Sequence, residues 1–264
     1  MSGSEQREDL VLVVDVGNTN SVFGLFRGSD LVQDFRISTE AQRTADEYAA
    51  LLLPLFARYG INSEAVRALM VSSVVPPVNM HLERLAADYF GTDVLFVSPD
   101  LATGIEVRYD NPQEVGADRI VNAVAARELC GAPVVAVDFG TATTFDVIAP
   151  DGAYIGGVIT PGLGISAEAL FSRASRLSKV DVRRPERILG SNTTEAIQAG
   201  LYYGYIGLVD GILERLLADL PPNCPVIATG GESELIASGS RHIQRVDTNL
   251  TLTGLRLICQ LNFR

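Results

Sequence analysis

Two segments of the chain place an aspartate and a glycine turn at the end of an apolar run. The first reads Asp15-Val16-Gly17-Asn18-Thr19-Asn20 after the run 11–14, and the second reads Asp138-Phe139-Gly140-Thr141-Ala142-Thr143 after the run 133–137. Glycine lets a backbone approach a phosphate closely, and turn N–H groups with Asn or Thr side chains can donate to its oxygens. An aspartate at the strand end can hold a cation directly or through water, as Mg²⁺ prefers. Either segment alone could be an ordinary turn, but the recurrence favours two phosphate-binding hairpins.

The elements that must position these turns are predicted to be strands. An apolar run returns after each turn, over residues 21–26 and up to Ile148, and each return ends in a second turn, at 27–30 and at 149–152. Such self-similarity predicts two copies of one unit that face each other and hold a triphosphate from both sides. A third strand, 225–228, precedes Gly230 and Gly231, which fits the same architecture but by itself indicates only a turn.

Composition supports a folded chain with a sizeable core. Of 264 residues, 47% are hydrophobic and 20% are charged, which permits one large domain or two of ordinary size. No run approaches the ~20 apolar residues that cross a bilayer, so we expect no membrane segment. Residues 1–10 are polar and acidic, and we predict a disordered lead-in rather than a targeting peptide. Three widely spaced cysteines predict reduced thiols in a cytoplasmic protein.

The charge pattern argues against a nucleic-acid partner. The net charge is −11, whereas a duplex binder needs a basic surface that releases counterions from phosphate. The one basic cluster, Arg183, Arg184 and Arg187, is short enough to be a solvated loop. Lys179 is the only lysine, which excludes a P-loop. A phosphate site must therefore use backbone N–H groups, hydroxyls, arginine or a metal ion.

Two further segments are predicted to begin helices. Residues 117–129 have the apolar rhythm of an amphipathic helix, and Asp118 in its first turn is what the helix dipole stabilises. The same helix N-terminus is expected to lower the pKa of Asp118 and to weaken it as a base. Asn192 and Glu195 form a capping-box pattern around Thr193. From the residues alone, Asp118 is a helix-start carboxylate and Thr193 is part of an N-cap region.

The hairpin pair is the phosphate-binding signature of the actin, hexokinase and Hsp70-like superfamily, and the chain resembles type III pantothenate kinases over roughly residues 11–262. The resemblance rests on several segments in the order and spacing of that family. These are Asp15–Asn20, Arg108–Arg119, Asp138–Asp146, Gly156–Gly162, Ser166–Leu170, Asn192-Thr193 and Gly200–Gly207.

This resemblance implies an α/β fold of two RNase H-like (actin-like ATPase) domains that face an ATP cleft. The expected domains are residues 11–111 and 112–264. The implied reaction is the ATP-dependent phosphorylation of pantothenate to 4′-phosphopantothenate, the first step of coenzyme A biosynthesis, by a cytoplasmic homodimer. The alternative is a regulatory paralogue of the Bvg accessory factor type that keeps the fold without turnover.

The resemblance also implies a role for individual residues. Asp118 becomes the general base, Asp138 binds a monovalent cation (K⁺ or NH₄⁺), and Mg²⁺ arrives with ATP and lies near Asp15. Whether Thr193 acts in its own subunit or across a dimer stays open. The implied pantothenate-binding residues are Tyr109, Gly116, Ala117, Asp118, Arg119 and Thr193. The implied ATP-binding residues are Asp15, Val16, Gly17, Asn18, Thr19, Asn20, Ser21, Val22 and Thr141.

Some alternatives remain for these segments. Arg119 could instead form a surface ion pair with Glu114 or Asp110. The glycines at 200, 204, 207 and 211 mark one face of a helix, where packing inside the subunit is the default and the homodimer, with Tyr202, Tyr203 and Tyr205 alongside, is the alternative. A two-metal nuclease is disfavoured by the acidic charge, and an actin-like kinase for sugars or acetate lacks a supporting pattern. His81 and His242 lie outside every motif and are expected to be structural.

Overall fold

The computed structural model describes residues 9–98, 100–174 and 179–263, and these form two compact units. The first unit contains the described residues up to Gly104, together with Asn111–Val124 and the chain from Thr251 onward. The second contains Ile105–Asp110 and Ala125–Leu250. The expected boundary near Asn111, between domains 11–111 and 112–264, stays a prediction. Of the predicted lead-in 1–10, residues 1–8 lie outside the described residues, and Leu10 belongs to the first strand.

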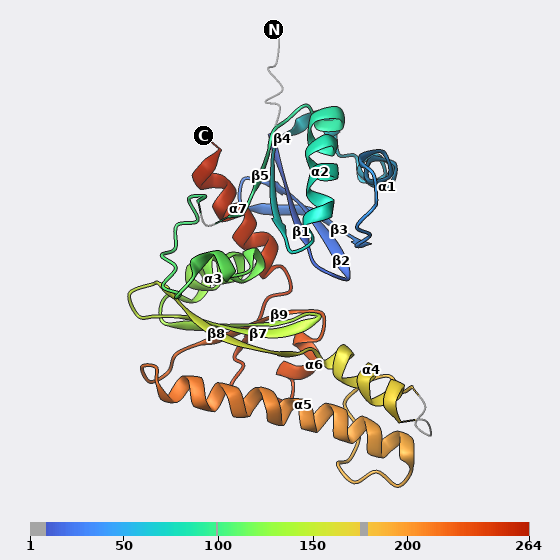
Figure 1. The fold of residues 1–264 in the computed structure, drawn as a ribbon, viewed down its shortest axis with the longest axis vertical. Coiled ribbons are helices and arrows are strands. Elements are labelled where there is room, and N and C mark those ends of the chain that lie inside the picture. Colours follow the sequence, from blue (N-terminus) through green and yellow to red (C-terminus); the bar gives the residue numbers. More distant parts are fainter. Residues whose placement is uncertain (1–8, 99, 175–178, 264) are drawn as a thin grey trace. The chain divides into compact units, whose positions relative to one another are not determined.

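The first unit is built on a mixed sheet of five described strands in the order β3-β2-β1-β4-β5 (Figure 1). β1 is antiparallel to β2 and parallel to β4, and β2 is antiparallel to β3. The strands are β1 Leu10–Val16, β2 Asn20–Arg27, β3 Asp30–Ser38, β4 Val66–Ser73 and β5 Val94–Phe96. The helices are α1 Ala45–Arg58, α2 Pro76–Leu85 and α7 Leu250–Asn262, with short 3₁₀ or π turns at Ser63–Ala65, Ala86–Phe90 and Pro112–Glu114.

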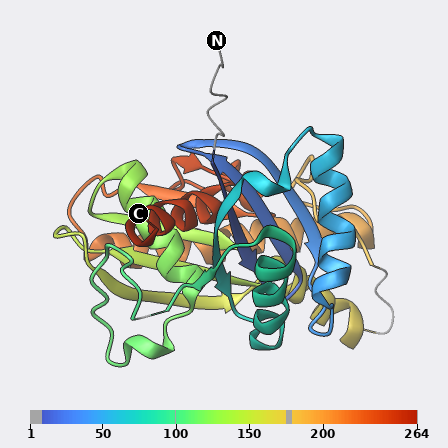
Figure 2. The same ribbon diagram turned by 90° about the horizontal axis from the view of Figure 1, so that it is seen from above.

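The alternation of side chains along β1 and β2 explains how helices cover this sheet. Val14 and Phe23 are partners in the ladder and are fully buried in the cluster that α1 and α2 complete. Figures 1 and 2 both show α1 next to α2. The partners Val13 and Gly24 point to the opposite face, where a Cβ on Gly24 would lie 3.0 Å from Leu252 of α7. Each large side chain buried in this way stabilises the fold by about 1.5–3 kcal/mol.

The second unit repeats the plan with five described strands in the order β10-β9-β6-β7-β8. β6 is antiparallel to β7 and parallel to β9, as β1 is to β2 and β4. In Figure 1 the long helix α5 runs along one face of this sheet. The strands are β6 Val134–Phe139, β7 Ala142–Ile148, β8 Tyr154–Pro161, β9 Val226–Gly230 and β10 Arg245–Val246. The helices are α4 Leu163–Arg173, α5 Thr193–Ala218 and α6 Ser233–Ala237.

Helix α3, Ala117–Cys130, begins in the first unit and ends in the second. Its first half packs against α7, because the Thr251 hydroxyl donates to Asn122 Oδ1 at 2.8 Å. Gly254 approaches the Val121 carbonyl oxygen so closely that any Cβ would collide with it.

The two mixed sheets confirm the predicted α/β class, and both predicted hairpins are present. None of the helices in the described ranges is long and apolar enough to cross a membrane. Cys130, Cys224 and Cys259 are free thiols, and the latter two are buried.

Candidate active site

The first predicted hairpin joins β1 to β2. Asp15, half-buried, is the penultimate residue of β1, and the Gly17 amide closes the turn by donating to the Asn20 carbonyl oxygen at 3.0 Å. Asn18 and Thr19 at the tip are exposed. Ser21 is fully buried and shares a 2.8 Å hydrogen bond with the Thr39 hydroxyl, which fixes the base of the turn. The base of the turn is therefore held in place by hydrogen bonds, and its tip is exposed. Both features suit a phosphate-binding loop.

The second hairpin joins β6 to β7 through a turn that is one residue shorter than the first. The Gly140 amide donates to the Ala142 carbonyl oxygen at 3.1 Å, Asp138 is half-buried, and Thr141 is exposed at the tip. Gly162, which follows β8, donates its amide to the Thr141 carbonyl oxygen at 3.0 Å. A Cβ on Gly162 would collide with the carbonyl oxygens of Gly140 and Thr141. The end of β8 therefore supports this turn only because residue 162 lacks a side chain.

The predicted Gly-Gly turn lies beside the second hairpin, because β9 pairs in parallel with β6. Gly231 donates its amide to the Phe139 carbonyl oxygen at 3.1 Å. Gly230 has φ +94°, and a Cβ there would lie 2.7 Å from Asp138 Oδ1. Gly230 and Gly231 thus allow the backbone of this turn to lie close to the carboxylate of Asp138 at the end of β6. Burial raises the pKa of Glu232, the next residue along the chain.

Asp118 occupies the first turn of α3, and one expectation about it was wrong. Its Oδ1 accepts a hydrogen bond from the Arg119 amide at 2.8 Å. This bond and the nearby Arg119 charge lower the pKa, as a helix start should, but burial has the larger effect and raises the pKa of Asp118. A carboxylate with a raised pKa is a stronger base, contrary to the expectation from the helix start alone. A Cβ on Gly116 would lie 2.5 Å from Asp118 Oδ1, so the carboxylate in its present position requires glycine at 116 and would have to move for any other residue.

Arg119 is only 7% exposed, so it does not lie on the surface, whereas its pairing with Glu114 or Asp110 stays a prediction. Glu114, one of the suggested partners, is exposed and accepts a hydrogen bond from the Asn111 side chain at 2.9 Å. Ala117 is the first residue of α3 and is half-buried. The first unit thus holds Gly116, Ala117, Asp118 and Arg119 at one helix start.

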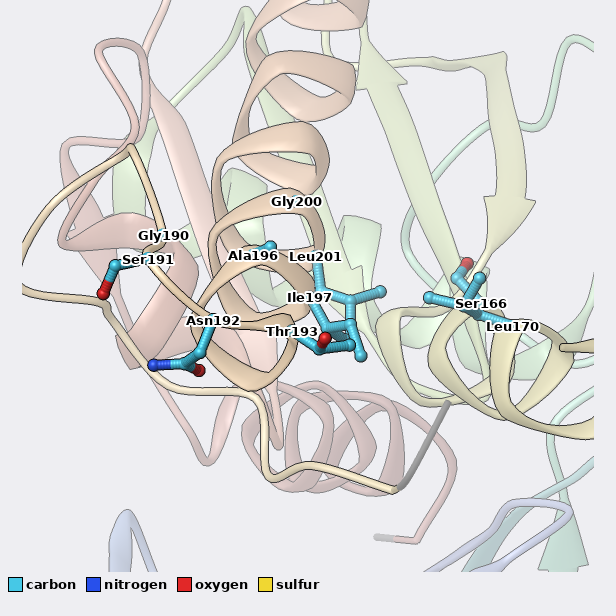
Figure 3. A pocket seen from close by; sticks show the side chains of 10 residues that line it. All are labelled: Ser166, Leu170, Gly190, Ser191, Asn192, Thr193, Ala196, Ile197, Gly200 and Leu201. Atoms are coloured by element: carbon cyan, nitrogen blue, oxygen red, sulfur yellow. The ribbon is translucent and has the colours of Figure 1, made fainter. Parts of the chain in front are cut away.

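Thr193 is the first residue of α5 and lies in a pocket of about 780 Å³ in the second unit. Figure 3 shows Ser166 and Leu170 of α4 on one side and the first turns of α5 on the other. Asn192 is the N-cap, as predicted, and its Oδ1 accepts from the Glu195 amide at 3.0 Å. The capping box differs by one residue, because the Glu195 carboxylate accepts from the Ser191 amide at 2.8 Å instead. Hydrogen bonds from Ser191, foremost its backbone amide, lower the pKa of Glu195 to about 2.

The glycine stripe on α5 does not pack inside the subunit, so the default expectation was wrong. Among the described residues, none has an atom within 4 Å of a Cβ built on Gly200, Gly204 or Gly207. Tyr202 and Tyr205 point the other way and are buried, at 1% and 5% exposure. Within the described ranges these three glycines form an open face of the helix, whereas Gly211, the fourth of the predicted stripe, is half-buried and a Cβ there would lie 3.5 Å from Arg215 Nη1.

The structure brings some predicted residues together within the second unit and separates others. Asp138 and Thr141 lie with Gly162 and Gly230 at one end of the sheet, and Ser166 joins them by donating its hydroxyl to the Gly162 carbonyl oxygen at 2.9 Å. Tyr109 instead lies beside Tyr154, at the opposite end of β8. The supporting roles of Gly162, Gly230 and Ser166 were missed from sequence, although Gly162 and Ser166 lie in the segments that carry the resemblance.

Comparisons with known proteins agree with this arrangement. A sequence model of the family described as type III pantothenate kinase matches residues 11–215. The protein named type III pantothenate kinase from Koribacter versatilis is 49% identical over 96% of this chain and 96% of its own length. That from Geobacter sulfurreducens is 52% identical over 96% of this chain and 99% of its own.

Solved structures share the fold at low identity. The inorganic polyphosphate/ATP-glucomannokinase from Arthrobacter sp. strain KM has a TM-score of 0.52 at 15% identity, covering 96% of this chain and 99% of that one. Component A of (R)-2-hydroxyglutaryl-CoA dehydratase from Acidaminococcus fermentans has a TM-score of 0.55 at 13% identity, covering 96% of each chain. These similarities show the fold alone, which is that of sugar kinases and actin-like ATPases.

Proposed function

The chain belongs to the type III pantothenate kinase family, and from that premise we propose which of its residues perform each part of the reaction. The enzyme phosphorylates pantothenate with ATP, a step of coenzyme A biosynthesis. A regulatory role without turnover is not favoured. The structural observation that carries the assignment of residues is the recurrence of one strand–turn–strand unit with a strand-end aspartate, at Asp15 and at Asp138.

Asp118 is proposed to be the general base. Its carboxylate accepts the proton of the primary hydroxyl of pantothenate while the hydroxyl oxygen attacks the γ-phosphorus of ATP. The bond from that phosphorus to the β,γ-bridging oxygen breaks, and ADP leaves. Burial that raises the pKa of Asp118 supports this role, because a more basic carboxylate accepts a proton more readily. Phosphoryl transfer depends mostly on positioning and on charge neutralisation, so a carboxylate suffices.

Pantothenate is proposed to bind to Arg119, Tyr109, Gly116, Ala117 and Thr193. Arg119 carries the positive charge that suits the substrate's carboxylate. Gly116 keeps space for the Asp118 carboxylate, whereas Tyr109 and Thr193 are exposed on the second unit. Whether Thr193 serves its own subunit or a partner is part of the homodimer proposal.

ATP is proposed to bind through residues 15–22 and Thr141, with Mg²⁺ near Asp15. The half-buried carboxylate of Asp15 at the end of β1 is an oxygen donor that fits such an ion. Mg²⁺ in kinases is held by one or two carboxylates, phosphate oxygens and water rather than by an all-protein cage. When bound, the ion neutralises charge that develops on the phosphates.

Asp138 is proposed to hold the monovalent cation, K⁺ or NH₄⁺. Gly230, which has no side chain, brings its backbone close to both Asp138 Oδ1 and the Phe139 carbonyl oxygen. Carbonyl and carboxylate oxygens are the donors that a K⁺ ion accepts in place of its water shell. The oxygen-rich surroundings of Asp138 therefore fit the cation.

We further propose that the enzyme is a cytoplasmic homodimer without nucleic-acid or membrane partners. The open glycine stripe of α5 supports the homodimer, because glycines within a helix cost about 1 kcal/mol each unless a close contact compensates. The acidic charge supports the absence of a nucleic-acid partner.

The reaction is tested by following ADP release with purified protein, ATP and Mg²⁺ over a panel of acceptors, with and without K⁺. The panel contains pantothenate, hexoses, acetate and a reaction without acceptor. We expect pantothenate alone to raise ADP release above the blank and K⁺ to increase the rate. Equal rates with a sugar, or none above the blank, would contradict the proposal.

A further inference from the structure

The segment Ile105–Asp110, which carries Tyr109, belongs to the second unit and is attached to it at Tyr154. Val107 forms a one-residue parallel bridge with Tyr154. The Arg108 amide donates to the Tyr154 carbonyl oxygen, and the Tyr154 amide donates to the Glu106 carbonyl oxygen, both at 2.8 Å. Both backbone groups of Tyr154 therefore hold the residues immediately before Tyr109.

The side chain of Tyr154 is itself held by a hydrogen bond to a buried carboxylate. Its side chain is fully buried, and its hydroxyl donates to Asp146 Oδ1 at 3.0 Å. Asp146 is also fully buried, and its Oδ2 accepts from the Thr144 hydroxyl at 3.0 Å. Because a buried carboxylate is costly unless it is hydrogen-bonded, this contact strongly favours one position of Tyr154.

The other contacts of the segment are weaker anchors. Arg108 pairs with Glu106 at 2.8 Å and with Asp151 at 2.6 Å, but all three side chains are largely exposed. Exposed ion pairs contribute about 0–1 kcal/mol to stability. The buried pair of Asp146 and Tyr154 is therefore a stronger support of the segment than these exposed ion pairs.

The Tyr109 ring packs on a bulge in β8. Val147 pairs with Gly156 and Ile148 with Tyr154, so Ile155 is the extra residue. Bulges re-aim neighbouring side chains. Gly156 has φ +121°, which L side chains rarely adopt, and a Cβ there would touch the Tyr109 ring at 3.5 Å. The centroids of the Tyr109 and Tyr154 rings are 6.4 Å apart, with a tilt of 48°.

Tyr109 thus has one supported face and one free edge. It remains 38% exposed, and no residue within the described ranges forms a hydrogen bond with its hydroxyl. A tyrosine ring that is packed on one face, and whose hydroxyl has no hydrogen-bond partner among the described residues, is suited to contacting a bound molecule.

We infer that Asp146, Tyr154 and Gly156 are positioning residues that fix Tyr109 for contact with pantothenate. We name these three residues the Tyr109 platform. The inference rests on the proposed function, because it takes Tyr109 to bind pantothenate. The platform acts through Tyr109 and does not touch the substrate, so it affects the KM for pantothenate rather than the KM for ATP.

The test measures steady-state kinetics of the full-length enzyme with Tyr154→Phe, Gly156→Ala and Tyr109→Ala, and with each platform variant combined with Tyr109→Ala. Tyr154→Phe removes only the hydroxyl that donates to Asp146. Gly156→Ala strains the bulge and adds a methyl group against the ring. The matched control is Tyr202→Phe, which deletes another buried tyrosine hydroxyl, one that lies 3.3 Å from the Ser238 hydroxyl.

We expect each platform variant to raise the KM for pantothenate about three- to tenfold, in keeping with the sensitivity of activity to small misplacements. The kcat and the KM for ATP should stay near wild type, as should all constants of Tyr202→Phe. In the Tyr109→Ala background the platform substitutions should raise the KM no further. A purely structural role would not produce this loss of effect. If Gly156→Ala does not fold, the kinetic constants of Tyr154→Phe, alone and combined with Tyr109→Ala, test the inference.

The two possible failures are distinguishable. An unchanged KM for pantothenate in Tyr109→Ala removes Tyr109 from binding and overturns both the assigned role and the platform. If Tyr109→Ala raises the KM but the platform variants leave it unchanged, or raise it equally in the Tyr109→Ala background, the platform alone is overturned.

Discussion

Gly162 lies directly against the turn that carries Thr141, because its amide donates to the Thr141 carbonyl oxygen at 3.0 Å. The φ of Gly162 is −65°, so alanine could adopt this backbone conformation without strain. A side chain at residue 162 is excluded by a steric clash instead, because a Cβ would collide with the carbonyl oxygens of Gly140 and Thr141. The position of the turn between β6 and β7 thus depends on the absence of one methyl group at residue 162.

Gly162→Ala should displace this turn and weaken ATP binding. Overpacking of this kind costs about 1–3 kcal/mol of stability. A displaced Thr141 should raise the KM for ATP on the order of tenfold, because small misplacements strongly affect activity. Steady-state kinetics with ATP varied, together with thermal unfolding, measures both effects.

The matched control is Gly164→Ala, two residues further along the chain. Gly164 is exposed in the first turn of α4, and among the described residues none lies within 4 Å of its added Cβ. Alanine there should stabilise the helix by about 0.5–1 kcal/mol and leave the KM for ATP unchanged. If Gly162→Ala lowers the unfolding temperature but leaves the KM for ATP at the control value, the second hairpin does not bind ATP.

Asp118→Asn should remove most of the turnover while the protein stays folded. Asparagine keeps the acceptor for the Arg119 amide, which Asp118 Oδ1 accepts at 2.8 Å. It cannot accept the proton of the substrate hydroxyl, so kcat should fall on the order of 10²-fold or more. Single-turnover measurement of phosphopantothenate checks the chemical step. A rate near wild type would remove Asp118 from the mechanism.

The raised pKa of Asp118 also predicts the direction of a pH effect on the rate. Protonated Asp118 cannot act as a base, so activity falls as the pH drops through its pKa. Because burial raises that pKa, the acid limb of kcat/KM should lie above the ordinary aspartate value of about 3.9. A pH–rate profile over the acid range measures this, and an acid limb at or below the ordinary value would contradict the role of burial.

The same shift predicts that Asp118→Asn is more stable than the wild type at neutral pH. A carboxyl whose pKa is raised by folding adds stability below its unfolded pKa and loses that contribution as the pH rises through the folded pKa. At neutral pH the wild type therefore carries an unfavourable buried charge, which asparagine removes. Thermal unfolding of both proteins at neutral and acid pH should show the advantage of Asp118→Asn shrinking as the pH falls.

The features that sequence predicted are local ones. The hairpins at Asp15 and Asp138 follow from apolar runs and glycine turns within about ten residues. The helix start at Asp118 follows from the periodicity of the residues after it. Each of these depends on neighbours in the chain, and each is present in the structure.

The features that sequence missed depend on distant residues. The pKa of Asp118 could not be predicted from its helix position, because its burial depends on tertiary packing. The need for glycine at 162 could not be predicted either, because it comes from Gly140 and Thr141, about twenty residues earlier in the chain. The glycines of α5 suggested a buried face because a stripe of small residues marks close packing, but it does not say whether the packing lies inside one subunit.

Asp138→Ala should abolish or weaken the stimulation by K⁺. The carboxylate is the one charged group that the proposal assigns to the cation, and the Phe139 carbonyl oxygen, which Gly230 approaches together with Asp138 Oδ1, remains. Titration of the rate with KCl at constant ionic strength, held with a large organic cation, separates specific binding from screening. Asp15→Asn, which alters the other hairpin, should weaken ATP binding and keep a K⁺ response. A K⁺ titration identical to wild type in Asp138→Ala would exclude Asp138 as the cation ligand.

Gly204→Arg should split the proposed homodimer. Gly204 is exposed, and within the described ranges nothing lies near its added Cβ, so one chain accommodates the arginine and its helix gains about 1 kcal/mol of propensity. Two copies joined through this stripe would meet a bulky charge on each side.

Light scattering after gel filtration should give twice 28.3 kDa for wild type and 28.3 kDa for Gly204→Arg. Gly204→Ala, which gains the same propensity without bulk, should stay dimeric. An unchanged mass for Gly204→Arg places any interface elsewhere, and a monomeric wild type contradicts the homodimer itself.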